Sequence, residues 1–144
     1  MKCFVNFAHV PMIADTRYTT SMADDGINRD EIPEVVLVVN GTIGMSEGKA
    51  IGQAFQAAAR WQHVARNSYP DHALDWICSG TRTIVKITKS KTIWERIVSE
   101  VPGFVMKDEG FTEVERDTPT IFICYPFLHK DRPKLLDNKK VKML

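Results

Sequence analysis

The sequence contains few cysteines, and their spacing suits neither a disulfide framework nor a zinc site. Cys3, Cys78 and Cys124 are odd in number, lie far apart and form no C-x-x-C pair. Disulfide-rich secreted domains and zinc modules both depend on closely spaced cysteines. The cysteine pattern therefore argues against these two classes, and we expect no metal in the protein.

Long hydrophobic runs are also missing. No apolar run approaches the roughly 20 residues that span a bilayer. The first residues, "MKCFVNFAHVPMIADTR", hold one early lysine and a short, interrupted apolar stretch, which is a poor secretory signal. With 144 residues, 44% hydrophobic and 26% charged, the chain has the profile of one globular domain with a modest core. We expect a soluble, cytoplasmic protein without a membrane partner.

Several common catalytic motifs are absent as well. A phosphate-binding loop of the form G-x-x-x-x-G-K-[ST] would need glycine at position 43 and a hydroxyl residue at position 50, where the chain has Ile43 and Ala50. The chain has no G-x-S-x-G elbow, no H-E-x-x-H and no H-x-E with P-C-x-x-C. Its four histidines are scattered. These observations disfavour P-loop enzymes, serine hydrolases of the elbow type, zinc proteases and zinc deaminases.

Charge is nearly balanced overall but uneven along the chain. The net charge is +1, yet residues 1–34 hold six acidic against three basic residues, and residues 130–144 hold six basic against two acidic ones. A basic C-terminal tail over 130–144 would suit a polyanion such as nucleic acid. On charge alone, a solvated terminus is the favoured interpretation.

Hydrophobic periodicity predicts an α/β fold. Residues 1–33 have no sustained period and are expected to form a loosely ordered N-terminal extension. The pattern then predicts strands at 34–40, 81–88, 104–110 and 118–126, and helices over 47–66, 72–80 and 91–101. Strands interleaved with helices indicate a small mixed four-stranded sheet covered by helices in a three-layer α/β/α arrangement. We expect one domain over 34–129, followed by the tail.

The first predicted helix carries a polar stripe. Ser46 is a plausible N-cap, and side chains at i, i+4, i+7 and i+11 then share one side of the helix, namely Lys49, Gln53, Gln56 and Arg60. A lysine in the first turn costs about 0.3–1 kcal/mol against the helix dipole, but it attracts an anion or a developing oxyanion. The alternative is a solvated helix face, and the stripe alone does not choose between them.

Four segments together resemble a known family. "EVVLVVN", "MSEGKAIGQAFQAAARW", "WICSGTRTIVKI" and "KDEGFTEVERDTPTIFICYP" resemble the peptidyl-tRNA hydrolase type 2 family in their order and spacing, over residues 34–126. That family shows G-K-x-A-x-Q-x-x-H-A-A after its first strand, and D-A-G-x-T-[QE] followed by a G-[TS]-x-T pattern before its last. A match spread over four segments is more specific than any one of them.

The matching positions and the departures are both informative. The chain keeps the family's motif residues at Lys49, Gln53, Asp108, Gly110, Thr112, Thr118 and Thr120. Its departures from the family include Gln56 where the family has histidine, Asn40 where arginine is common, Glu109 where alanine stands in D-A-G, and Asp117 where glycine precedes the threonine.

The resemblance implies hydrolysis of the ester that links a peptide to the 3′ ribose of tRNA, which recycles tRNA, without a metal or an organic cofactor. It implies catalytic roles for four residues, with Asp108 orienting the water, Lys49 supplying electrostatic stabilisation, and Thr112 and Thr118 orienting either group. It implies substrate binding by a second set, Gln53, Gln56, Arg60 and Thr120.

Two alternatives stay open. Gln56 in place of histidine removes a titratable group, which also suits a catalytically weak member that binds tRNA or a protein partner. A small regulatory α/β domain would leave the Lys49 stripe unexplained. Homodimer formation is left open by the sequence.

Overall fold

The computed structural model describes residues 28–144, so most of the predicted extension over 1–33 lies outside the described residues. The strands are β1 (Pro33–Asn40), β2 (Thr83–Thr88), β3 (Gly103–Lys107), β4 (Pro119–Cys124), β5 (Phe127–Leu128) and β6 (Val141–Met143). The helices are α1 (Glu47–Ser68), α2 (Pro70–Cys78) and α3 (Lys91–Glu100). Three short 3₁₀ turns complete the described part, η2 (Arg29–Glu31), η3 (His129–Asp131) and η4 (Lys134–Asp137).

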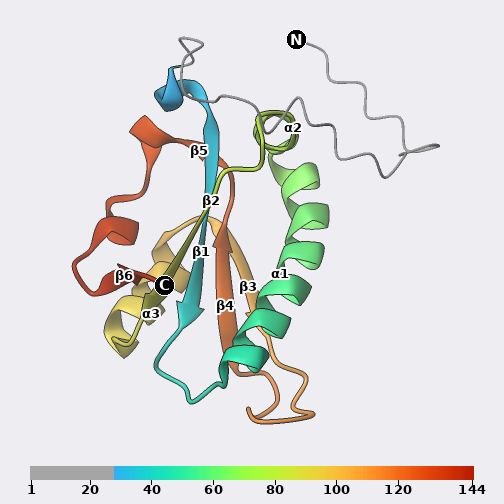
Figure 1. Ribbon diagram of the computed structural model, residues 1–144, viewed down its shortest axis with the longest axis vertical. Coiled ribbons are helices and arrows are strands. Elements are labelled where there is room, and N and C mark those ends of the chain that lie inside the picture. Colours follow the sequence, from blue (N-terminus) through green and yellow to red (C-terminus); the bar gives the residue numbers. More distant parts are fainter. Residues whose placement is uncertain (1–27) are drawn as a thin grey trace, which may run out of the picture.

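One mixed sheet organises these elements (Figure 1). Its strands lie in the order β3-β4-β1-β2-β6, and β5 pairs with the start of β1. β1 and β2 are parallel, whereas the other pairs are antiparallel. The predicted α/β class and mixed sheet are confirmed. The prediction of four strands is wrong, because the sheet has six. The strands β5 and β6, with two and three residues, are too short to show a period in sequence. The three-layer α/β/α arrangement stays a prediction.

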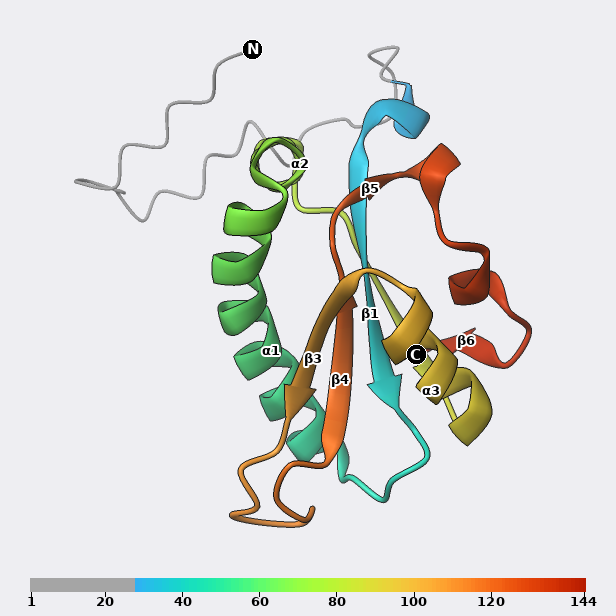
Figure 2. The ribbon, with the colours of Figure 1, turned by 180° about the vertical axis from the view of Figure 1, so that it is seen from behind.

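The central strand explains the apolar run "EVVLVV". All eight residues of β1 are buried, since β4 and β2 flank the strand and helices pack on the sheet. α1 runs alongside β3 and β4 (Figure 2) and buries Ala57, Trp61 and Ala65 against the sheet. The Trp61 indole N–H donates to the Cys124 carbonyl at 2.9 Å, so this large ring packs without an unsatisfied donor.

The C-terminal segment packs against the domain instead of lying free in solvent. Leu136 is fully buried, and β6 extends the sheet beside β2. Arg132 donates through Nε to the buried Glu34 carboxylate at 2.7 Å, and its side chain is only 14% exposed. Lys86 Nζ lies 2.9 Å from Asp137 Oδ1. The charge pattern had suggested a solvated terminus, which is wrong for Arg132. The division at residue 129 stays a prediction.

Candidate active site

The first turn of α1 is tied to the loop between β3 and β4. Ser46 caps the helix as predicted, because its hydroxyl accepts from the Lys49 N–H at 3.2 Å. The same Ser46 donates its hydroxyl and its backbone N–H to the Glu113 carboxylate, at 2.7 and 2.8 Å. Glu113 was not among the predicted site residues. The signal that could have identified it is the T-[QE] step of the family's motif, where Glu113 follows Thr112.

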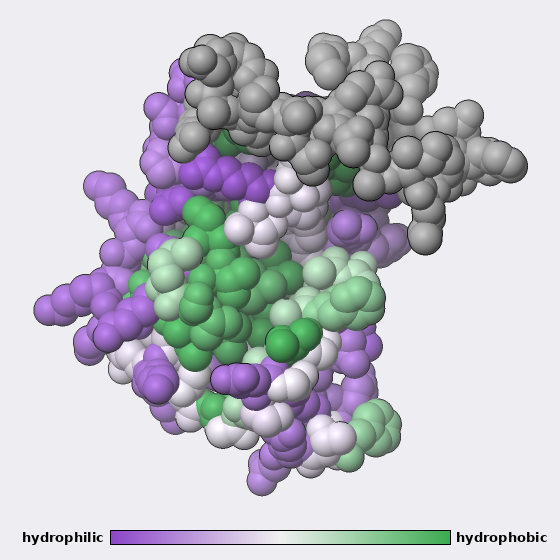
Figure 3. Space-filling view, viewed as in Figure 1, coloured by the Kyte–Doolittle hydropathy of each residue, from purple (hydrophilic) through white to green (hydrophobic). Residues whose placement is uncertain are grey.

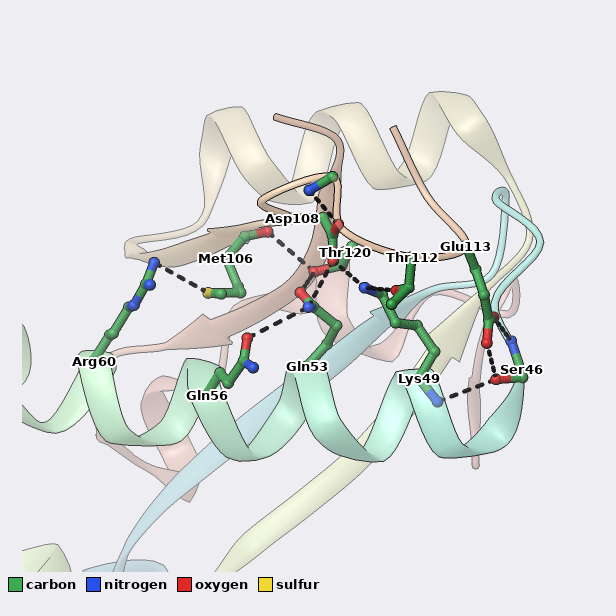
Figure 4. A network of polar contacts seen from close by, with 11 residues as sticks. Ser46, Lys49, Gln53, Gln56, Arg60, Met106, Asp108, Thr112, Glu113 and Thr120 are labelled. Carbon is green, nitrogen blue, oxygen red and sulfur yellow. Dashed lines mark hydrogen bonds and ion pairs between the residues drawn. The ribbon is translucent and has the colours of Figure 1, made fainter. Parts of the chain in front are cut away.

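Lys49 reaches from α1 to two residues of that loop (Figure 4). Its Nζ lies 2.5 Å from Asp108 Oδ2 and donates to Thr112 Oγ1 at 2.7 Å. The Asp108 side chain is 2% exposed and that of Lys49 is 14% exposed, whereas Thr112 is exposed. The ammonium group therefore joins a buried carboxylate to a hydroxyl that solvent can reach.

Gln53 holds the buried side of this carboxylate. Its amide nitrogen donates to Asp108 Oδ2 at 2.7 Å, and its amide oxygen accepts from the Thr120 hydroxyl at 2.7 Å. The ionised carboxylate can only accept here, so the amide nitrogen must face Asp108 and the amide oxygen must face Thr120. Gln53 and Thr120 are both buried. They were predicted to bind substrate, but their burial favours positioning Asp108.

An irregularity in the sheet aims Thr120 at α1. The β3–β4 ladder pairs Met106 with Ile121 and Lys107 with Pro119, which leaves Thr120 as the extra residue of β4. Such a bulge turns a side chain away from the direction that strict alternation would give it. Here it brings the Thr120 hydroxyl to Gln53 on the helix.

The surroundings of Asp108 keep it ionised. Burial acts to raise its pKa, but the hydrogen bond from Lys49, the backbone N–H of Gly110 and the charge of Lys49 outweigh burial, so the pKa lies below its usual value. Gly110 donates to Oδ1 at 2.7 Å. It adopts φ +78°, and a Cβ there would lie 2.7 Å from the Cβ of Arg116. Only glycine fits this turn without strain.

Hydrogen bonds and an ion pair thus join a polar cluster of five residues, namely Lys49, Gln53, Asp108, Thr112 and Thr120. The remaining predicted residues lie around this polar cluster. Gln56 is exposed, with its amide oxygen 3.4 Å from the Gln53 amide nitrogen. Arg60 lies near Met106 Sδ, at 3.8 Å, and near the Glu109 carboxylate, at 3.5 Å. Thr118 joins the cluster through its main chain, because its carbonyl accepts from the Asp108 N–H at 3.0 Å.

A hollow lies on the other flank of α1, away from Lys49 and Asp108. It has a volume of about 710 Å³, and Lys49, Gln53 and Asp108 do not line it. Its walls are mostly apolar, and Figure 3 shows apolar side chains gathered on this face. The residues of β1, β2 and α1 that line it include Leu37, Val39, Val85, Ile87, Ala50 and Ala54. The polar cluster and the apolar hollow thus share one helix but occupy different sides of it.

Other chemistries find little support in residues 28–144. Within that range, no group of three or more histidine, cysteine or acidic side chains is placed to hold a metal ion. Burial raises the pKa of the Cys124 thiol to about 12, so this cysteine is not a nucleophile at neutral pH. No helix of the described range combines the length and the apolar character needed to cross a membrane.

Comparison with known proteins agrees with the geometry. A family model described as "Peptidyl-tRNA hydrolase PTH2" matches residues 34–138, which is 105 of the 144 residues. No individually curated protein matches the chain significantly. The match covers α1 and the whole β3–β4 loop, and therefore every residue of the polar cluster. The chain belongs to the peptidyl-tRNA hydrolase PTH2 family, the hydrolases that cleave the ester between peptide and tRNA.

Proposed function

We propose that Lys49, Asp108 and Thr112 form the centre at which this protein hydrolyses peptidyl-tRNA. The observation that carries the proposal is the joint contact of the Lys49 ammonium with Asp108, at 2.5 Å, and with Thr112, at 2.7 Å. Family membership supplies the reaction, and this contact supplies the groups that an ester hydrolysis needs: a cation for the oxyanion and a hydroxyl to orient water.

Asp108 acts mainly through Lys49 in this proposal. Both of its oxygens already accept hydrogen bonds, from Lys49, Gln53 and Gly110, and the side chain is almost fully buried. A carboxylate with a lowered pKa is also a weak base. Asp108 therefore holds the ammonium in position, and the electrostatic contribution to catalysis exceeds that of base strength.

Thr112 orients the attacking water. Its oxygen accepts from Lys49 and retains a lone pair for one hydrogen of the water, and its exposure lets water and ester reach it. The water oxygen bonds to the carbonyl carbon, and Lys49 stabilises the negative charge that develops on the carbonyl oxygen. The ester C–O bond then breaks, and a proton from the water passes to the departing ribose oxygen. The products are a peptide acid and a tRNA with a free 3′ end.

In this proposal, the exposed residues of the polar stripe on α1 contact the substrate. Gln56 and Arg60 continue along α1 from Lys49 on the same side, and both are exposed. A hydrogen-bonding amide and a guanidinium suit the sugar and phosphate of the RNA end. Gln53 and Thr120 hold Asp108 from the buried side. The proposed compartment is the cytoplasm, where peptidyl-tRNA forms during translation, and homodimer formation stays open.

The test measures release of labelled amino acid from an N-blocked aminoacyl-tRNA. Lys49→Ala is expected to lower turnover at saturation by roughly 10²–10³-fold, the range for losing one oxyanion donor. Lys91→Ala is the matched control, since Lys91 also lies in the first turn of a helix but its Nζ lies 4.0 Å from Glu95 on the same helix, with its side chain 83% exposed. EDTA should leave the rate unchanged.

The same assay separates the enzyme from the alternative. A wild-type protein that released no more amino acid than buffer, while a known hydrolase succeeded in parallel, would end the catalytic assignment. Binding of the intact aminoacyl-tRNA by that inactive protein would then favour the weak family member that only binds tRNA.

A further inference from the structure

The β3–β4 loop presents an aromatic ring beside the candidate site. Phe111 is 88% exposed, the largest exposed fraction among the large hydrophobic side chains of residues 28–144. Its neighbours on both sides are held by the site, because Gly110 donates to Asp108 and Thr112 accepts from Lys49. The ring is therefore exposed on a loop that the site holds through the main chain of the residue before it and through the side chain of the residue after it.

The other exposed aromatic residues within 28–144 are Phe55 and Tyr69. Phe55 follows Lys49 by six residues, which at 100° per residue places it about a third of a turn away around α1. Tyr69 stacks on Tyr125, with ring centroids 4.6 Å apart. Phe111 is thus the exposed aromatic residue that the catalytic loop itself carries.

The charge of the loop limits what it can bind. Residues 108–117 hold five acidic side chains and one basic one, namely Asp108, Glu109, Glu113, Glu115, Asp117 and Arg116. Such a segment repels the phosphates of RNA. An uncharged aromatic face is the attractive contact that it offers to the substrate.

The substrate provides a matching group. The reacting ester lies on the ribose of the last nucleotide of tRNA, an adenosine whose base is unpaired. Unpaired bases are recognised mainly by stacking on aromatic side chains. We infer that Phe111 is the stacking platform for the base of this terminal adenosine, and that stacking places the ester carbonyl against Lys49. This inference rests on the proposed function.

The test compares Phe111→Ala with Phe111→Tyr, which keeps an aromatic ring. Phe111→Ala is expected to raise KM for N-blocked aminoacyl-tRNA about 5- to 150-fold, which corresponds to roughly 1–3 kcal/mol per stacked base. Turnover at saturation should change little, and Phe111→Tyr should stay close to wild type. Phe55→Ala removes an equally exposed ring, 77% exposed, from α1 and should leave KM unchanged.

A substrate without a base makes the test specific. With an N-blocked aminoacyl ester of abasic ribose, wild type and Phe111→Ala should have the same KM. An equal loss on both substrates would show that Phe111 only supports the loop, and an unchanged KM on both would show that it does not touch the base; either result overturns the inference.

Direct binding separates this inference from the proposed function. Phe111→Trp places an indole on this loop. The fluorescence that the variant gains over wild type, which already holds three tryptophans, should be quenched by the trinucleotide CCA and not by abasic ribose phosphate. If the wild-type protein were inactive on tRNA, quenching by CCA would still support base stacking, and its absence would refute it.

Discussion

At the scale of single residues, the pKa of Asp108 predicts how this buried carboxylate responds to pH. The pKa of this carboxyl lies below its ordinary value, because hydrogen bonds from Lys49 and Gly110 outweigh burial. A lowered folded-state pKa stabilises the protein above the unfolded value and loses that stabilisation as the pH falls through the folded value. The contribution of ionised Asp108 to the stability of the fold is therefore complete at neutral pH. It disappears only below about pH 4, the ordinary range in which an aspartate titrates.

We therefore expect Asp108 to add no acid limb to turnover between about pH 5 and pH 8. Asp108→Asn should lower turnover at neutral pH, because the Lys49 ammonium loses its anionic partner. It should also reduce the difference in free energy of unfolding between pH 7 and pH 3, measured by urea denaturation. An acid limb centred above pH 5 that Asp108→Asn abolishes would contradict this prediction and indicate a general base.

Thr120 supports the same carboxylate through Gln53. Thr120→Val keeps the shape of the side chain but leaves the Gln53 amide oxygen without its donor at 2.7 Å. An unsatisfied buried acceptor costs about 1–3 kcal/mol, so the free energy of unfolding should fall by that amount. Turnover should fall with it because Gln53 is then free to turn away from Asp108. Thr120→Ser keeps a hydroxyl at this position, so it should keep most of the stability and most of the turnover of wild type. A Thr120→Val variant that is as active and as stable as Thr120→Ser would exclude this supporting role.

At the scale of elements, the long periodic segments could be predicted and the short ones could not. The helix predicted over 47–66 is α1, Glu47–Ser68, and the strand predicted over 34–40 is β1, Pro33–Asn40. The stripe of α1 followed from helical spacing alone. The bulge at Thr120, the Glu113 contact with Ser46 and the strands β5 and β6 depend on partners far away in sequence, which periodicity does not encode.

The loop between β3 and β4 carries strain at Asp117. This residue adopts φ +64°, and the family usually has glycine here. Asp and Asn tolerate this conformation better than other residues with a Cβ, whereas glycine adopts it freely. Asp117→Gly should therefore be neutral or slightly stabilising, and Asp117→Ala should be less stable than Asp117→Gly by about 1 kcal/mol. Urea unfolding of the two variants measures the difference, and an alanine variant at least as stable as the glycine variant would contradict the prediction.

At the scale of the whole molecule, the C-terminal segment has two kinds of basic residue that charge counting cannot separate. Arg132 is paired with Glu34, whose position lies 98 residues earlier in the chain. Only the fold brings the two together, so the sequence suggested a free cation. The lysines of the segment are exposed instead, namely Lys130, Lys134, Lys139, Lys140 and Lys142.

These two kinds of residue should respond differently to mutation. Arg132→Gln leaves the buried Glu34 carboxylate with less compensation, which should cost about 3 kcal/mol of folding free energy, at the low end for a broken buried pair because Arg82 lies 3.4 Å away. Its melting temperature should fall. Replacing the five exposed lysines with glutamine should leave the melting temperature nearly unchanged, because exposed charges contribute little to stability.

The five-lysine variant should instead change tRNA binding. If these lysines lie near phosphates, tRNA binding by the variant releases fewer counterions than binding by wild type. Affinity then falls, and the slope of log K against log salt becomes shallower by up to about 0.9 for each phosphate contact removed. Turnover at saturation should stay the same, since Lys49 and its partners are untouched. Binding titrations at several salt concentrations measure the slope. An unchanged slope would show that the segment lies outside the tRNA footprint and serves the fold alone, through Arg132, Leu136 and β6.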